Sequence, residues 1–161
     1  MDGTSFLLSA GAGWLAGMRS MTAPAAAAFR LRRRVAPPVG AARLLAPPAA
    51  RWVLPVLALG EMAADKRPGI GDRTAAPSLA ARATSGALTA AAIAGGRRLR
   101  RARTREMLGA AALGACFAVL SSYANLWLRR AASRRTGASE QTLGYAEDVL
   151  AAGLGTAVAT L

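Results

Sequence analysis

Two carboxylates follow directly after an apolar run near residue 60. Glu61 and Asp65 come after the apolar residues 52–59, and Lys66 and Arg67 follow them. Residues four apart share one face of a helix, so both acids would point the same way. An acid within a membrane span is costly and tends to be functional. We therefore expect Glu61 to bind a cation or relay protons, whereas Asp65, beside two bases, fits an interfacial charge cluster.

Charged residues also occur inside the first and last apolar runs. Arg19 lies in the first run, and Pro24 follows it. Proline disturbs the turn before it. One interpretation is a broken helix that presents Arg19 to an acid partner or an anionic ligand. The other, which we favour, is an arginine that pairs within the bundle and fixes helix register. Glu147 and Asp148 lie in the last run and, as helix neighbours about 100° apart, cannot both face one partner.

The fourth apolar run is polar at its centre, where Ser121 and Asn125 lie. These side chains would form hydrogen bonds between helices or line a polar path. Catalysis has little support, because the chain has no histidine and its glycine-rich pieces lack the lysine and spacing of a phosphate loop. A single cysteine without histidine also excludes a His/Cys zinc site. We expect neither an enzyme nor a metal or cofactor.

Composition admits three classes of protein. The 161 residues are 53% hydrophobic and carry a net charge of +13, which suits a membrane protein, a basic nucleic-acid binder or a disordered alanine-rich chain. The arginines cluster between the apolar runs, whereas a nucleic-acid module more often carries them along one amphipathic helix. Disorder usually accompanies low hydrophobicity. The pattern favours a membrane protein without a nucleic-acid partner.

The apolar runs predict an all-α fold, a polytopic membrane bundle of about five helices in one domain, residues 1–161. The expected helices cover residues 5–29, 45–64, 79–96, 107–128 and 142–160. The loops after the first and third helices hold six arginines each, and the other two loops hold four bases each. Because basic loops tend to remain in the cytoplasm, this bias predicts the N-terminus outside and the C-terminus inside.

Two further features concern symmetry and assembly. Segments 5–29 and 107–128 both have polar middles, and both precede an arginine-rich loop and a helix with paired acids. This predicts an inverted repeat, with those two segments running in opposite directions, although chance similarity in a biased composition is an equal alternative. Gly13 and Gly17 form a GxxxG pattern, which favours close helix contacts and motivates an expected homo-oligomer.

Four short motifs stand at these positions. They are Gly17-Met18-Arg19-Ser20, Glu61-x-x-x-Asp65-Lys66, Arg82-x-x-x-Gly86 and Glu147-Asp148. With them, the chain resembles the small bacterial integral membrane proteins catalogued as domain of unknown function 4126, from about Phe6 to Gly155. The resemblance implies a multi-helix membrane protein and supplies no activity. It marks Arg19, Glu61, Asp65, Glu147 and Asp148 as motif positions without assigned roles.

The main hypothesis is a bacterial inner-membrane protein that binds or transports a small ion or solute. Its site would centre on Arg19, Glu61 and one of Glu147 or Asp148, with Ser121 and Asn125 lining it. The alternative is a non-catalytic scaffold or assembly factor whose basic loops hold anionic lipid head groups. The loop bases that would do so are Arg32, Arg33, Arg34, Arg97, Arg98, Arg100 and Arg101.

Overall fold

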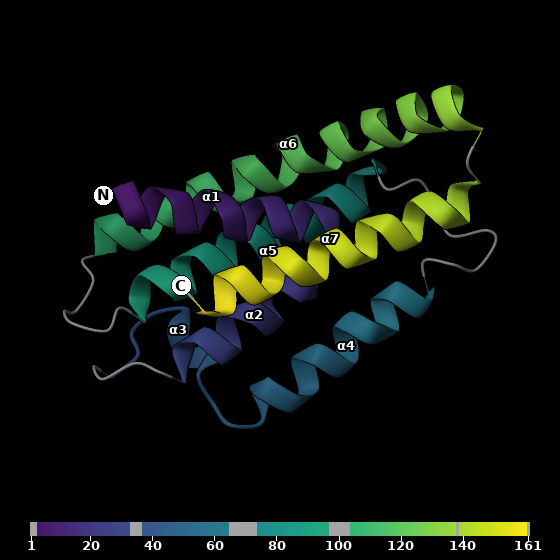
Figure 1. Ribbon diagram of the computed structural model, residues 1–161. Coiled ribbons are helices and arrows are strands. Elements are labelled where there is room, and N and C mark those ends of the chain that lie inside the picture. The colour runs from purple at the N-terminus through teal and green to yellow at the C-terminus, as the bar shows by residue number, and fades with distance from the viewer. Residues whose placement is uncertain (1–2, 33–36, 65–73, 97–103, 138, 161) are drawn as a thin grey trace.

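The computed structural model describes residues 3–32, 37–64, 74–96, 104–137 and 139–160 (Figure 1). Within these ranges the chain is helical and contains no strand, which confirms the all-α prediction. The helices are α1 (Gly3–Met18), α2 (Thr22–Leu31), α3 (Ala42–Leu45), α4 (Ala50–Ala64), α5 (Ala76–Gly95), α6 (Thr104–Thr136) and α7 (Glu140–Thr160).

The first expected helix is divided, and the chain reverses between its two parts. Pro24 lies in the first turn of α2, where a missing N–H is tolerated. In a continuous helix its ring would clash with the carbonyl of Ser20, which favours a break between α1 and α2. A Cβ at Gly155 of α7 would contact both Leu15 and Thr22, which puts α2 back alongside α1. Helices α1 and α2 therefore form a helical hairpin.

This hairpin overturns the expected positions of the chain termini. Both termini lie at the same end of the bundle, together with α3 and the start of α6 (Figure 1). The prediction that they lie on opposite sides is wrong, because segment 5–29 turns back instead of running the length of the bundle. Helices α4, α5, α6 and α7 each run between the two ends (Figure 1).

Glycines let α1, α5 and α6 pack backbone against backbone. A Cβ at Gly13 would overlap the carbonyl of Gly114, and one at Gly17 would overlap the carbonyl of Ala118. Gly86 of α5 meets Gly114 from the other side. The GxxxG pattern thus makes contacts within the chain, so it no longer argues for an oligomer.

The same contacts remove the expected symmetry. Gly13 lies beside Gly114 and Gly17 beside Ala118, so α1 and α6 run in the same direction. The prediction that segments 5–29 and 107–128 run in opposite directions is wrong. Segment 107–128 is also part of one uninterrupted helix, α6, whereas segment 5–29 is broken. The inverted repeat therefore has no support.

Helix α4 is attached differently from the others. It packs against α2 and α3, and Ala58 is its one buried residue. The remaining surface is largely apolar and exposed, and includes Trp52, Val53, Val56, Leu57 and Leu59. Within the described ranges, α6 is the one helix long and apolar enough to cross a membrane by its length and composition. Its 33 residues extend about 50 Å.

Candidate functional site

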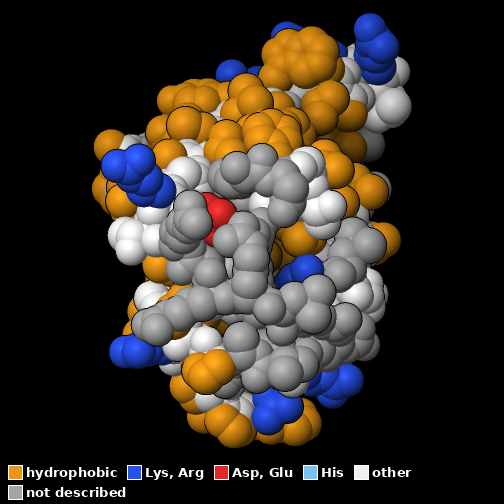
Figure 2. All heavy atoms as spheres, turned by 90° about the vertical axis from the view of Figure 1, so that its left-hand side faces the viewer, with side chains coloured by type: hydrophobic (Ala, Val, Ile, Leu, Met, Phe, Trp, Pro, Cys, Tyr) orange, Lys and Arg blue, Asp and Glu red, His pale blue; other side chains and the backbone are white. Residues whose placement is uncertain are grey.

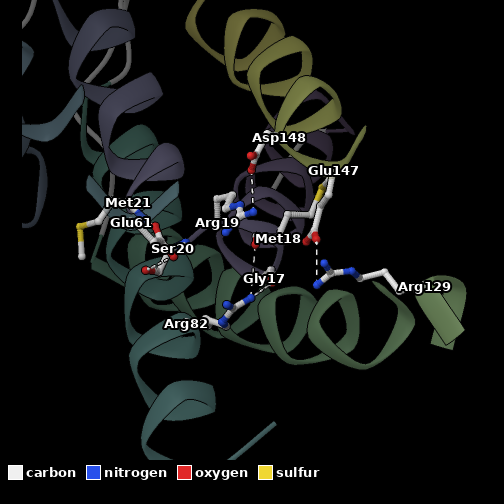
Figure 3. Close-up of polar contacts among 10 residues, drawn as sticks. All are labelled: Gly17, Met18, Arg19, Ser20, Met21, Glu61, Arg82, Arg129, Glu147 and Asp148. Atoms are coloured by element: carbon white, nitrogen blue, oxygen red, sulfur yellow. Dashed lines mark hydrogen bonds and ion pairs between the residues drawn. The ribbon is translucent and has the colours of Figure 1, made fainter. Parts of the chain in front are cut away.

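The candidate site surrounds residues Arg19–Met21, which we call the helix break. An interrupted helix leaves unpaired carbonyls at the end of its first part and unpaired N–H groups at the start of its second part. Buried groups of this kind need partners, because each unpaired one costs about 1–3 kcal/mol. Side chains from α4, α5 and α6 supply these partners (Figure 3).

The N–H side of the break is bound by Glu61 of α4. Its Oε1 accepts hydrogen bonds from the backbone N–H and the hydroxyl of Ser20, both at 2.9 Å. Its Oε2 accepts a bond from the N–H of Met21 at 2.8 Å. A carboxylate at the start of a helix is also favoured by the helix dipole. Glu61 therefore serves as the N-terminal cap of α2, from a position forty residues along the chain.

The carbonyl side of the break is bound from α5 and α6. Nη1 of Arg82 donates to the carbonyls of Gly17 and Met18, at 2.5 and 3.3 Å. The hydroxyl of Ser122 also reaches the Gly17 carbonyl, at 3.3 Å. The hydroxyl of Ser85 donates to the carbonyl of Ser20. In a helix this carbonyl would accept from the N–H of residue 24, which is a proline and has no N–H.

Arg19 points from the break towards α7. Its guanidinium is 1% exposed, and Nη2 lies 2.6 Å from Oδ1 of Asp148. The neighbouring Glu147 points elsewhere, with Oε2 3.7 Å from Nη1 of Arg129 on α6. The two acids of the last motif thus bind different arginines, in agreement with the expectation that they cannot share one partner (Figure 3).

The serine and asparagine of α6 have unequal roles. The hydroxyl of Ser121 donates to the carbonyl of Trp14 at 2.8 Å and ties α6 to α1. The amide of Asn125 donates to the carbonyl and hydroxyl of Ser121 in its own helix. Ser121 therefore lies against the last turns of α1, whereas Asn125 reaches that region through Ser121.

The structure brings together most of the expected residues, although not as one ligand cage. Arg19 binds Asp148, while Glu61 binds the backbone of Ser20 and Met21 (Figure 3). Asp65 lies outside the described residues, as do the loop bases Arg33, Arg34, Arg97, Arg98, Arg100 and Arg101. Arg32 is described and exposed, near the end of the bundle that holds the termini.

Sequence reasoning missed three residues of the site. Arg82 and Arg129 count as loop bases in the charge comparison, yet both lie within helices. Ser85 had no place in the expected site. A signal for Arg82 exists, because Pro77 marks the first turn of α5 and puts Arg82 inside that helix. For Arg129 the pattern held no such signal, since the change from apolar to basic residues after Leu128 suggests a helix end, whereas α6 continues to Thr136.

Among the described residues, the positive and negative charges around the break balance. Two arginines, Arg19 and Arg82, and two acids, Glu61 and Asp148, are held by backbone groups or by each other. Removing one partner would leave a buried charge uncompensated, which is strongly destabilising. In the described part of the chain, no three metal-ligating side chains come together.

Each of the four sequence motifs contributes at least one residue to this place. Gly17-Met18-Arg19-Ser20 is the break, and Glu61, Arg82, Glu147 and Asp148 lie around it. No curated protein and no solved structure matches the chain. One family model, domain of unknown function (DUF4126), matches residues 6–161. The chain therefore belongs to this family.

Proposed function

We propose that the protein is a multi-pass inner-membrane protein of bacteria, in which α4 to α7 cross the bilayer and α1–α2 enter and leave from one side. Large apolar side chains on α4, α6 and α7 face outwards, as contact with lipid requires. Among them are Val56, Leu120, Trp127, Val149 and Leu150. In the hydrocarbon every backbone group needs an internal partner, and the helix break meets that demand.

The proposed orientation puts both termini in the cytoplasm. Segments 30–51 and 97–105 each contain six arginines. The described helix ends that flank these segments, at the end of α2 and the starts of α4 and α6, lie at the end that holds the termini. At the other end, Arg82 and Arg129 are engaged at the site and no longer count as loop bases. The excess of bases therefore favours the terminal end as the cytoplasmic one.

Two measurements test this arrangement. High-salt washing without detergent is expected to leave the protein in the membrane fraction; extraction by salt alone would contradict the membrane proposal. Reporters that are active only outside the cytoplasm, fused to either terminus, are expected to be inactive at both. Activity at one terminus alone would contradict the helical hairpin as a re-entrant element.

The proposed activity is the binding or transport of a small ion or solute at the helix break. The observation that carries it is the carboxylate of Glu61, held by three donors of the break across the boundary between α4 and α2. Interrupted helices whose ends point into the bundle recur at the substrate sites of transporters. Glu61 comes from α4, in which Ala58 is the one buried residue, so this contact can open with little disturbance of the remaining bundle.

Opening of the contact between Glu61 and the helix break would change which hydrogen-bond donors and charges are available to a ligand. With Glu61 in place, the donors of Ser20 and Met21 are occupied and the charges balance. With Glu61 withdrawn, those donors face the space that it leaves, beside the buried Arg19 and Arg82. A site that alternates between these states couples movement of α4 to the binding of an ion or solute.

Flux measurements in liposomes test the activity. The purified protein is reconstituted, and fluxes of protons, inorganic ions and small organic acids are compared for the parent, Glu61→Gln and Ser20→Ala. Arg130→Gln, an exposed position on α6, is the matched control. We expect flux in the parent and in Arg130→Gln, and at least tenfold less in Glu61→Gln. Absence of flux for all solutes, or equal flux in all variants, would contradict the proposal.

A further inference from the structure

Among the described residues, five arginines lie at the end of the bundle that holds the termini. They come from the ends of α2, α3, α4 and α6, and we call them the arginine collar: Arg30, Arg32, Arg43, Arg51 and Arg105. Arg32, Arg43 and Arg105 are exposed, and the other two are half-buried. Figure 2 views this end directly and shows basic side chains spread around it. The collar therefore brings together bases that are far apart in the sequence.

Three collar arginines are followed or preceded by an exposed apolar side chain. Phe29 precedes Arg30, Leu44 follows Arg43 and Trp52 follows Arg51. Phe29 is 39% exposed, Leu44 66% and Trp52 77%. Lysine and arginine beside exposed aromatic and aliphatic residues are typical of segments at the boundary between head groups and hydrocarbon. Trp in particular is enriched at that level of a bilayer.

Most of the described acids lie away from the collar. Of the described acids, Glu106 is the one near this end, while Glu61, Glu147 and Asp148 lie at the helix break. Nε of Arg43 donates to the carbonyl of Pro38 at 3.3 Å, which orients its guanidinium and leaves other N–H donors available. Guanidinium groups bind phosphate through paired hydrogen bonds.

We propose that the arginine collar binds the phosphate of anionic phospholipids. The occupant is a lipid rather than a nucleic acid because the bases alternate with apolar side chains, which would contact acyl chains and have no counterpart on a phosphodiester backbone. The inference rests on the proposed membrane location but not on transport. Anionic lipid would hold α2, α3 and α4 together at the end opposite to Glu61.

Lipid binding by the full chain in mild detergent tests this site. Native mass spectrometry is used to compare phosphatidylglycerol with phosphatidylcholine on the parent and on two triple variants. One is Arg32→Gln/Arg43→Gln/Arg105→Gln; the other, with equal loss of charge at the opposite end of α6, is Arg130→Gln/Arg134→Gln/Arg135→Gln. We expect the collar variant to lose about tenfold in affinity for phosphatidylglycerol and the control variant to change less than twofold.

Several results would overturn the proposal. Equal losses of affinity for phosphatidylglycerol in the two triple variants would mean that lipid binding depends on net charge and not on the position of the arginines. Equal binding of the two lipids by the parent would exclude recognition of the anionic head group. Binding of a short oligonucleotide more tightly than phosphatidylglycerol, with loss in the collar variant, would assign the surface to nucleic acid instead. Because flux is not measured here, failure of the transport proposal leaves these results unaffected.

Discussion

The helix break and α4 hold their positions by opposite means. Around the break, α1, α5 and α6 approach so closely that glycines are required, and polar groups of α4, α5 and α6 bind the interrupted backbone. Helix α4 exposes most of its apolar side chains and has one buried residue, Ala58. Its described polar link to the break is the carboxylate of Glu61.

This difference indicates where movement is possible. Close backbone packing leaves little freedom, because a shift of one helix would bring its atoms into overlap with the next. A helix with few buried side chains separates at a smaller cost, and elements that move are drawn from such regions. We therefore expect substitutions around the break to destabilise the whole bundle and substitutions on α4 to act locally.

The largest effect is expected from Arg19→Met. It leaves the carboxylate of Asp148, which is 13% exposed, without the arginine that contacts it at 2.6 Å. Breaking a buried ion pair by removing one partner costs about 3–5 kcal/mol. The fraction of protein that stays monodisperse on heating in detergent, measured by size-exclusion chromatography, checks this. The double variant Arg19→Met/Asp148→Leu is expected to regain much of the loss; if it is no better than the single variant, the pair does not explain the effect.

Gly114→Ala is expected to rank second. Its Cβ would overlap the carbonyl of Gly86 and lie 2.7 Å from Cβ of Ala90, so α5 and α6 must move apart. Overpacking of this kind costs about 1–3 kcal/mol. Gly11→Ala is the matched control, because nothing lies within 4 Å of a Cβ there. The same heating assay compares them, and equal stability of the two variants would show that the glycine contacts are looser than described.

Glu61→Gln is expected to have a smaller, local effect. The side-chain amide of glutamine has one acceptor oxygen, which can bind either Ser20 or Met21, and its NH₂ group then faces the N–H of the other residue. About one hydrogen bond is therefore lost, at a cost of roughly 1–3 kcal/mol. Hydrogen exchange is expected to rise in α4 and in the first turn of α2, with little change in α5 and α6. A uniform rise along the chain would contradict the independent attachment of α4.

Val56→Thr on α4 is expected to change stability in detergent by less than about 0.5 kcal/mol. Its side chain is 67% exposed, so folding of the bundle does not bury it. The same substitution makes the proposed lipid-facing surface more polar, and insertion into liposomes is expected to fall slightly. A stability loss as large as that of Gly114→Ala would mean that this face packs against protein.

Sequence reasoning predicted the helices better than their paths. Expected segments 79–96 and 142–160 agree with α5 and α7 to within a few residues. Long apolar runs without an internal proline favour a continuous helix, so their positions can be read from the sequence. The interruption near Pro24 was one of two interpretations that the sequence allowed for segment 5–29, and it was the less favoured one. The reversal at that interruption was not visible in the sequence, since a proline ends a helix without specifying the direction in which the chain continues.

The site shows the same division. Arg19, Glu61, Glu147 and Asp148 stand out in the sequence because charges are rare within apolar runs, and all four do lie around one helix break or its partner arginines. Ser85 and Arg129 do not stand out, because serine and arginine are common elsewhere in this chain. The role of Ser85 depends on the backbone carbonyl that it contacts, and the role of Arg129 depends on the acid that it contacts.

The sequence alone determined that the chain is helical, that its bases lie between apolar runs, and that few charged residues enter those runs. Local periodicity and composition decide these properties, so they need no knowledge of contacts. Only the tertiary structure decided that α1 and α2 form a hairpin and that Glu61 caps α2 across forty residues. Those pairings arise from packing between segments that are distant in the sequence, and the local pattern of residues does not show which segments will meet.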